Sequence, residues 1–224
     1  MDSPLLKRRH DTARPQLTLH RDIALTLARA HEVCGPSRRG FAIWAASRVQ
    51  GNAQTPILWI RPGWIPDQLY PDGVRQWMGL GMNPGRILTL TATRPEDLLW
   101  SMEEALRSGT VPLVVCELPG PPALTPVRRL HLAAETGAAE GRFAPLGLML
   151  TPTQTDRDGQ ITGGAPGVET RWHMAPTHEG ARQSWRLHRL RARSAAPKAW
   201  QLRQGKTGPE IASARGPQDA DGCV

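Results

Sequence analysis

Two glycines and the residues that follow them are the part of this sequence whose types and spacing could do chemistry. Gly35 and Gly40 are separated by four residues and stand between an apolar run at 30–34 and an amphipathic run at 41–49. That order is the frame of a phosphate-binding loop, in which backbone N–H groups and a helix N-terminus face an anion. A plain strand, turn and helix with two ordinary glycines would give the same pattern.

The side chains that would let such a loop work on a nucleotide are missing. Phe41 stands where a lysine would neutralise the terminal phosphates, and Ala42 stands where a hydroxyl would hold magnesium. We therefore predict a degenerate nucleotide loop with no ATPase activity, no cofactor and no bound metal. The alternative is a working NTPase in which Arg38 or Arg39 replaces the lysine, although a planar guanidinium is a poor substitute for the compact ammonium group of lysine.

Alternating apolar and amphipathic segments predict the elements that would position this loop. Strands are expected at 30–34, 56–60, 86–91, 111–116 and 146–150, and helices at 41–49, 73–79, 93–109 and 125–137. The third of these helices should begin with a capping box of Thr93 and Glu96 and end at Gly109. A weaker apolar pattern at 17–30 favours a further helix. Strands and helices that alternate at this spacing imply right-handed crossovers and a parallel sheet.

The pattern changes after residue 151. Residues 151–167 are polar and rich in glycine, which predicts a loop, and strands are expected at 170–174, 184–193 and 198–202. The fold class is therefore predicted to be α/β, with a mainly parallel sheet flanked by helices and antiparallel strands added at the C-terminal end.

Length and composition limit the organisation of the chain. With 224 residues, one α/β domain at 17–204 is expected, with a flexible basic arm at 1–16 and a disordered tail at 205–224. No run approaches the ~18 apolar residues of a membrane span, and the first residues lack the apolar segment of a secretory signal. The three cysteines have no metal-like spacing. We expect a cytoplasmic, reduced protein with no membrane association.

The net charge of +8 is distributed unevenly. Between residues 171 and 224, ten Lys and Arg residues stand against four acids. A basic C-terminal third is typical of proteins that contact nucleic acid or an acidic partner. A compositional bias towards arginine, with no binding role, is the alternative.

Two segments carry the candidate contacts for nucleic acid or a partner. The polar loop and the strand after it hold Arg157 and Arg171, balanced by three nearby acids. Alternation along the next strand would place three arginines on one face: Arg189, Arg191 and Arg193. Such a row would attract phosphates or an acidic protein surface, or would be a solvated edge that discourages aggregation.

Several segments, in their order and spacing, resemble the core of RecA and, more closely, the ImuA family. These are the RecA-like, SulA-related proteins of bacterial inducible-mutagenesis cassettes. The resemblance covers about residues 25–205, and no single motif in it is specific. The segments that carry it are 30–33, 33–40, 57–59, 88–117 with Leu-Leu-Trp-Ser-Met-Glu-Glu-Ala-Leu-Arg at 98–107, 171–172 and 185–197.

This resemblance implies a RecA-like fold and a role in DNA repair during the SOS response. The family acts in translesion synthesis and mutagenesis with ImuB, a polymerase homologue, and with an error-prone DNA polymerase. Its members are accessory factors there. RecA and single-stranded DNA are further candidate partners, and residues 151–170 match the position of the second DNA loop of RecA.

Departures from RecA support the expectation that ATP is not hydrolysed. The strand at 111–116 should end in an aspartate that orders magnesium, but Cys116 and Glu117 stand there. We interpret Glu117 as a surface acid at a strand end, with the alternative that it substitutes for the aspartate. A cell-division inhibitor like SulA, which shares the degenerate core, remains an alternative function.

Overall fold

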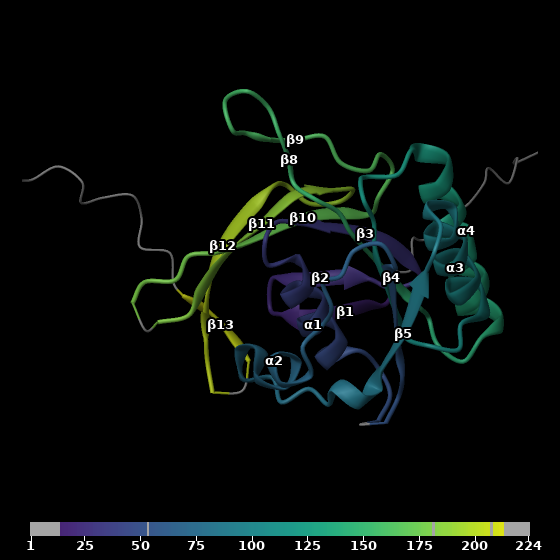
Figure 1. Ribbon diagram of the computed structural model, residues 1–224, viewed down its shortest axis with the longest axis horizontal. Helices are drawn as coiled ribbons and strands as arrows, with labels where there is room; N and C mark the ends of the chain where they lie inside the picture. The colour runs from purple at the N-terminus through teal and green to yellow at the C-terminus, as the bar shows by residue number, and fades with distance from the viewer. Residues whose placement is uncertain (1–13, 53, 181, 207, 213–224) are drawn as a thin grey trace, which may run out of the picture.

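A nine-stranded mixed sheet is the frame of the molecule (Figure 1). The computed structural model describes residues 14–212 except 53, 181 and 207. Nearly all of the predicted arm at 1–16, and residues 213–224 of the predicted tail, therefore lie outside the described residues. No helix in the described part of the chain has both the length and the apolar character needed to cross a membrane.

The sheet combines a parallel part with an antiparallel extension. Its strands are Arg29–Cys34 (β3), Ile57–Pro62 (β4), Ile87–Ala92 (β5), Leu113–Glu117 (β6), Leu146–Leu150 (β7), Thr170–Pro176 (β10), Ser184–Ala192 (β11), Lys198–Gln204 (β12) and Pro209–Ala212 (β13). Their order is β13-β12-β11-β10-β3-β7-β6-β4-β5, and the six strands from β10 to β5 run parallel. The predicted class, α/β with added antiparallel strands, is confirmed. The prediction of a disordered tail at 205–224 is wrong for β13, which pairs with β12.

Two helices, Pro95–Ser108 (α3) and Leu124–Glu140 (α4), lie side by side on one face of the sheet (Figure 1). Gly109 ends α3 with a φ of 57°, as predicted. The predicted capping box is wrong, because Arg94 takes the N-cap position and Glu96 pairs with Arg94 instead. The predicted end of α4 at Gly137 is also wrong: this glycine lies inside α4, where a Cβ would collide with backbone of α3.

The sheet curves around the elements on its other face (Figure 1). These are a hairpin of Gln16–His20 (β1) and Ile23–Thr26 (β2), the helices Arg38–Arg48 (α1) and Pro71–Gln76 (α2), and the 3₁₀ turns Trp77–Gly79 (η1) and Pro84–Arg86 (η2). The helix predicted at 17–30 is wrong. Its apolar residues Leu17, Leu19, Ile23 and Leu25 recur with the period of a strand, and all four are buried in the core cluster that contains α1.

Candidate functional site

The turn between β3 and α1 is tighter than a phosphate loop. Gly35 has a φ of 100°, a conformation that favours glycine, and a Cβ there would collide with the backbone oxygen of Met174. The amide of Ser37 donates to that same oxygen at 3.0 Å, and the amide of Arg38 donates to the Gly35 oxygen at 3.2 Å. Two N–H groups that could have faced an anion are therefore already bonded within the fold.

The second glycine lies inside α1, so the predicted loop between the two glycines is wrong. A Cβ on Gly40 would enter the indole of Trp77, which packs directly on the helix. Phe41 and Ala42 are completely buried, and the ring of Phe41 packs on Trp172 with 5.6 Å between ring centroids. Gly40 is therefore a packing glycine, and the positions predicted for the missing lysine and hydroxyl lie in the core.

An ion pair joins the start of α1 to the end of β6. Arg39 donates from Nε to Oε1 of Glu117 at 3.0 Å and from Nη2 to Oε2 at 2.7 Å. The indole Nε1 of Trp59 donates to the same carboxylate at 2.8 Å. Bidentate arginine–carboxylate pairs are strong and directional. Glu117 is only 8% exposed, so its interpretation as a surface acid is wrong.

This pair limits what the site can do chemically. Arg39 neutralises Glu117, so the carboxylate is not free to hold a divalent cation and the guanidinium is not free to hold a phosphate. Arg38, the other arginine considered as a replacement for the lysine, donates from Nη1 to the Gly35 oxygen at 3.2 Å. Within the part of the chain described, no group of three or more His, Cys, Asp or Glu side chains is arranged to hold a metal ion.

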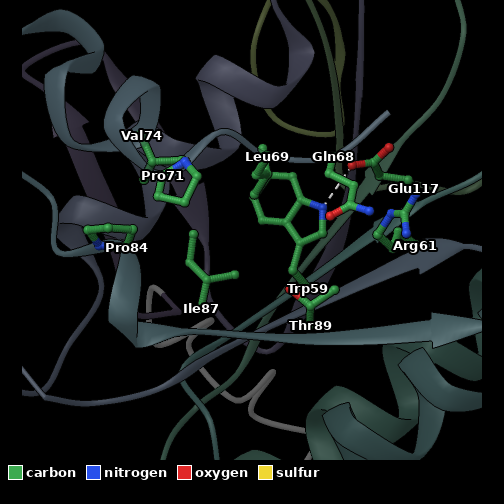
Figure 2. A pocket seen from close by; sticks show the side chains of 10 residues that line it. All are labelled: Trp59, Arg61, Gln68, Leu69, Pro71, Val74, Pro84, Ile87, Thr89 and Glu117. Carbon is green, nitrogen blue, oxygen red and sulfur yellow. Dashed lines mark hydrogen bonds between the residues drawn. The ribbon is translucent and has the colours of Figure 1, made fainter. Parts of the chain in front are cut away.

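A pocket of about 170 Å³ lies beside this ion pair, between β4, β5 and the segment that contains α2 (Figure 2). Polar side chains gather at one end of it and apolar side chains at the other, with the indole of Trp59 between them. The polar end holds Arg61, Gln68 and Glu117, and the apolar end holds Pro71, Val74, Pro84 and Ile87. The lining residues come from four separate stretches of the chain between Trp59 and Glu117, so no local sequence pattern indicates this pocket.

Arg171, predicted to contact DNA or a partner, is buried and holds the loop between β7 and β10. Its Nε lies 3.2 Å from Oε2 of Glu32, and its terminal nitrogens donate to the carbonyl oxygens of Thr162 and Gly163. Glu32 also accepts from the Thr151 hydroxyl at 2.7 Å. Arg171 therefore organises this loop from within, and the prediction of a contact role for it is wrong.

The loop itself contains a short hairpin, Gln154–Thr155 (β8) and Ile161–Thr162 (β9). Arg157 lies in the turn of this hairpin and is exposed. Its role as a contact residue stays a prediction.

A β-bulge separates the three arginines that were predicted to share a face. Trp172 pairs with Arg189, whereas the preceding Arg171 pairs with Arg191, so Arg189 and Arg191 lie on opposite faces of β11. The guanidinium of Arg189 lies over the ring of Trp200, 5.4 Å from its centroid. Arg191 is exposed. The predicted row of three arginines is therefore wrong.

Arg193 is tied to the end of the loop that precedes β10. Its Nη2 donates to the Gly167 oxygen at 3.3 Å, and its Nε lies 3.6 Å from a carboxylate oxygen of Glu169. Oε2 of Glu169 also lies 3.6 Å from Nε of the buried Arg29, so Arg193, Glu169 and Arg29 form a small charge network. Of the five predicted contact residues, Arg171 and Arg193 form ion pairs in the described part of the chain, which leaves Arg157, Arg189 and Arg191 without one.

Comparisons with known proteins add no family to these observations. No family model matches the chain, and no curated protein matches it significantly.

Proposed function

We propose that this protein is a non-catalytic, RecA-like accessory factor in SOS-induced translesion DNA synthesis. It acts in the cytoplasm with an ImuB-like polymerase homologue and an error-prone DNA polymerase. The biological setting comes from the resemblance to the ImuA family. The parallel sheet with antiparallel strands added at one side supports that resemblance at the level of fold class.

The pair of Arg39 and Glu117 is the observation that supports a non-catalytic role. A magnesium–triphosphate bound at the start of α1 would need a carboxylate for the cation and a positive side chain for the phosphates. Here the carboxylate of Glu117 and the guanidinium of Arg39 are hydrogen-bonded to each other. Removing one partner of a buried ion pair costs about 3–5 kcal/mol. The side chain of Arg39 is 26% exposed, so the lower end of that range applies.

Nucleotide titration tests the non-catalytic part of the proposal. Calorimetry with magnesium–ATP should give no saturable binding, and hydrolysis should stay at background with and without single-stranded DNA. Tight binding that is lost when Arg38 and Arg39 are both replaced by Ala would contradict the proposal and favour the NTPase alternative.

Partner capture tests the biological setting. The full chain should co-purify with an ImuB-like polymerase homologue from cells treated with a DNA-damaging agent. Cell filamentation on overexpression, without capture of a polymerase, would favour a SulA-like inhibitor instead.

A further inference from the structure

Arg61 differs from the other buried arginines of this protein. Arg29, Arg61 and Arg171 are each less than a tenth exposed. Arg29 lies 2.5 Å from a carboxylate oxygen of Glu135, and Arg171 lies 3.2 Å from one of Glu32. Arg61 has no carboxylate within ion-pairing distance among the described residues. A buried charge is normally paired, because removing it from water is costly.

The hydrogen bonds of Arg61 leave part of its guanidinium unused. Nη2 donates to the carbonyl oxygens of Ile65 and Asp67, the latter at 3.1 Å. Nε and Nη1 have no acceptor among the described residues. Arg61 lines the polar end of the 170 Å³ pocket, where Figure 2 shows it beside Gln68. The pocket therefore contains an unpaired positive charge with free donors.

The rest of the pocket is suited to a small apolar group. Its far end is formed by two prolines with Val74 and Ile87, and the indole of Trp59 forms the middle. An apolar cavity of about 150 Å³ is enough to hold one benzene molecule. A pocket of about 170 Å³ therefore has room for one ring or one short branched chain, and it is too small for a nucleotide.

We propose that this pocket binds a small organic acid, whose carboxylate pairs with Arg61 and whose single ring or branched chain lies between Trp59 and Ile87. Glu117 also lines the polar end, but its two oxygens already accept hydrogen bonds from Arg39 and Trp59. Arg39 and Glu117 cancel in charge, so the polar end keeps the positive charge of Arg61. This inference does not rest on the proposed function.

Binding of benzoate and isovalerate, measured by calorimetry, tests the inference. Benzamide and isovaleramide are the matched neutral probes, because they keep the shape and lose the charge. We expect saturable binding of at least one acid, and at least tenfold weaker binding of its amide. Equal affinity of acid and amide, no saturable binding of either acid, or inorganic phosphate binding as well as the acids would each overturn the inference.

Two variants of β5 test the location of the site. Thr89 is exposed and lines the pocket, so Thr89→Phe should fill it and weaken binding at least tenfold. Leu88 is exposed on the opposite face of the strand, so Leu88→Phe is the matched control and should leave affinity within twofold. Circular dichroism verifies that both variants fold. Unchanged binding in the Thr89 variant would place the ligand elsewhere and overturn the assignment.

Discussion

The buried histidine of β3 should make the stability of this protein depend on pH. His31 is completely buried, and its Nε2 lies 2.9 Å from the carbonyl oxygen of Thr26. A carbonyl oxygen can only accept, so Nε2 carries the proton and Nδ1 accepts from the Thr170 hydroxyl at 2.6 Å. The indole of Trp172 donates to the same Thr170 oxygen at 2.6 Å. This chain of hydrogen bonds holds the neutral ring and opposes a second proton at Nδ1.

Burial lowers the pKa of His31 from 6.5 to about 4. Because the folded-state pKa is depressed, the unfolded chain takes up its proton first as the pH falls. The stability that depends on His31 is therefore intact above pH 6.5 and is lost between pH 6.5 and 4. At about 1.4 kcal/mol per pKa unit, the loss is about 2 kcal/mol at pH 5 and about 3 kcal/mol at pH 4.

Urea unfolding of the wild type and of His31→Gln, at pH 7.5 and pH 5, measures this loss. A glutamine can donate to Thr26 and accept from Thr170, but it does not titrate. Other histidines with a pKa lowered by burial, such as His131, titrate in the wild type and in the variant alike, so their contributions cancel when the two losses are compared. The wild type should lose about 2 kcal/mol more than the variant between the two pH values. Equal losses would refute the assignment of the pH dependence to His31.

Three further substitutions test contacts described above. Glu117→Gln should lower the free energy of unfolding by about 3 kcal/mol, because it leaves a partly buried arginine without its anion. Gly40→Ala should lower the free energy of unfolding by about 1–3 kcal/mol in the same urea assay, because the added methyl group meets the indole of Trp77. The control Gly120→Ala places its methyl group in open space and should change the free energy of unfolding by no more than about 0.5 kcal/mol. Glu32→Gln should speed amide hydrogen exchange in the loop between β7 and β10 at least tenfold.

Each of these predictions has an outcome that would contradict it. An unchanged free energy of unfolding in Glu117→Gln would mean that its ion pair is too solvated to matter. Equal costs for the alanine variants of Gly40 and Gly120 would show that the indole moves aside. Unchanged exchange in Glu32→Gln would mean that the loop is held by its other contacts.

The elements that depend on local patterns could be predicted from the sequence. The strands β3, β4, β5, β6 and β7 and the end of α3 at Gly109 follow from apolar runs and from glycine at a helix end, although β5 is an edge strand that is largely exposed. A helix is predicted in place of the β1–β2 hairpin because the apolar residues there partly fit both the helical period of 3.6 and the strand period of two. Ile23 and Leu27 are four residues apart, as on a helix, whereas Leu17, Leu19 and Leu25 follow the period of two that the structure uses.

The site depends on contacts that no local pattern contains. Arg39 and Glu117 are 78 positions apart, so the sequence shows both charges but not their pairing. The bulge in β11 reverses the faces of its arginines, and nothing in the alternation of residues 184–193 predicts it. Glu32 did carry a signal: an acid inside a predicted buried strand implies a buried partner of opposite charge, which is Arg171.

The burial of Phe41 and Ala42 means that a lysine and a hydroxyl introduced at these two positions would not form a phosphate site. A lysine in place of Phe41 would place an ammonium group among the rings of Trp44 and Trp172, where burying an unpaired charge is prohibitively costly. Such a substitution would therefore destabilise the fold strongly. A phosphate site in this turn would first require the start of α1 to shift.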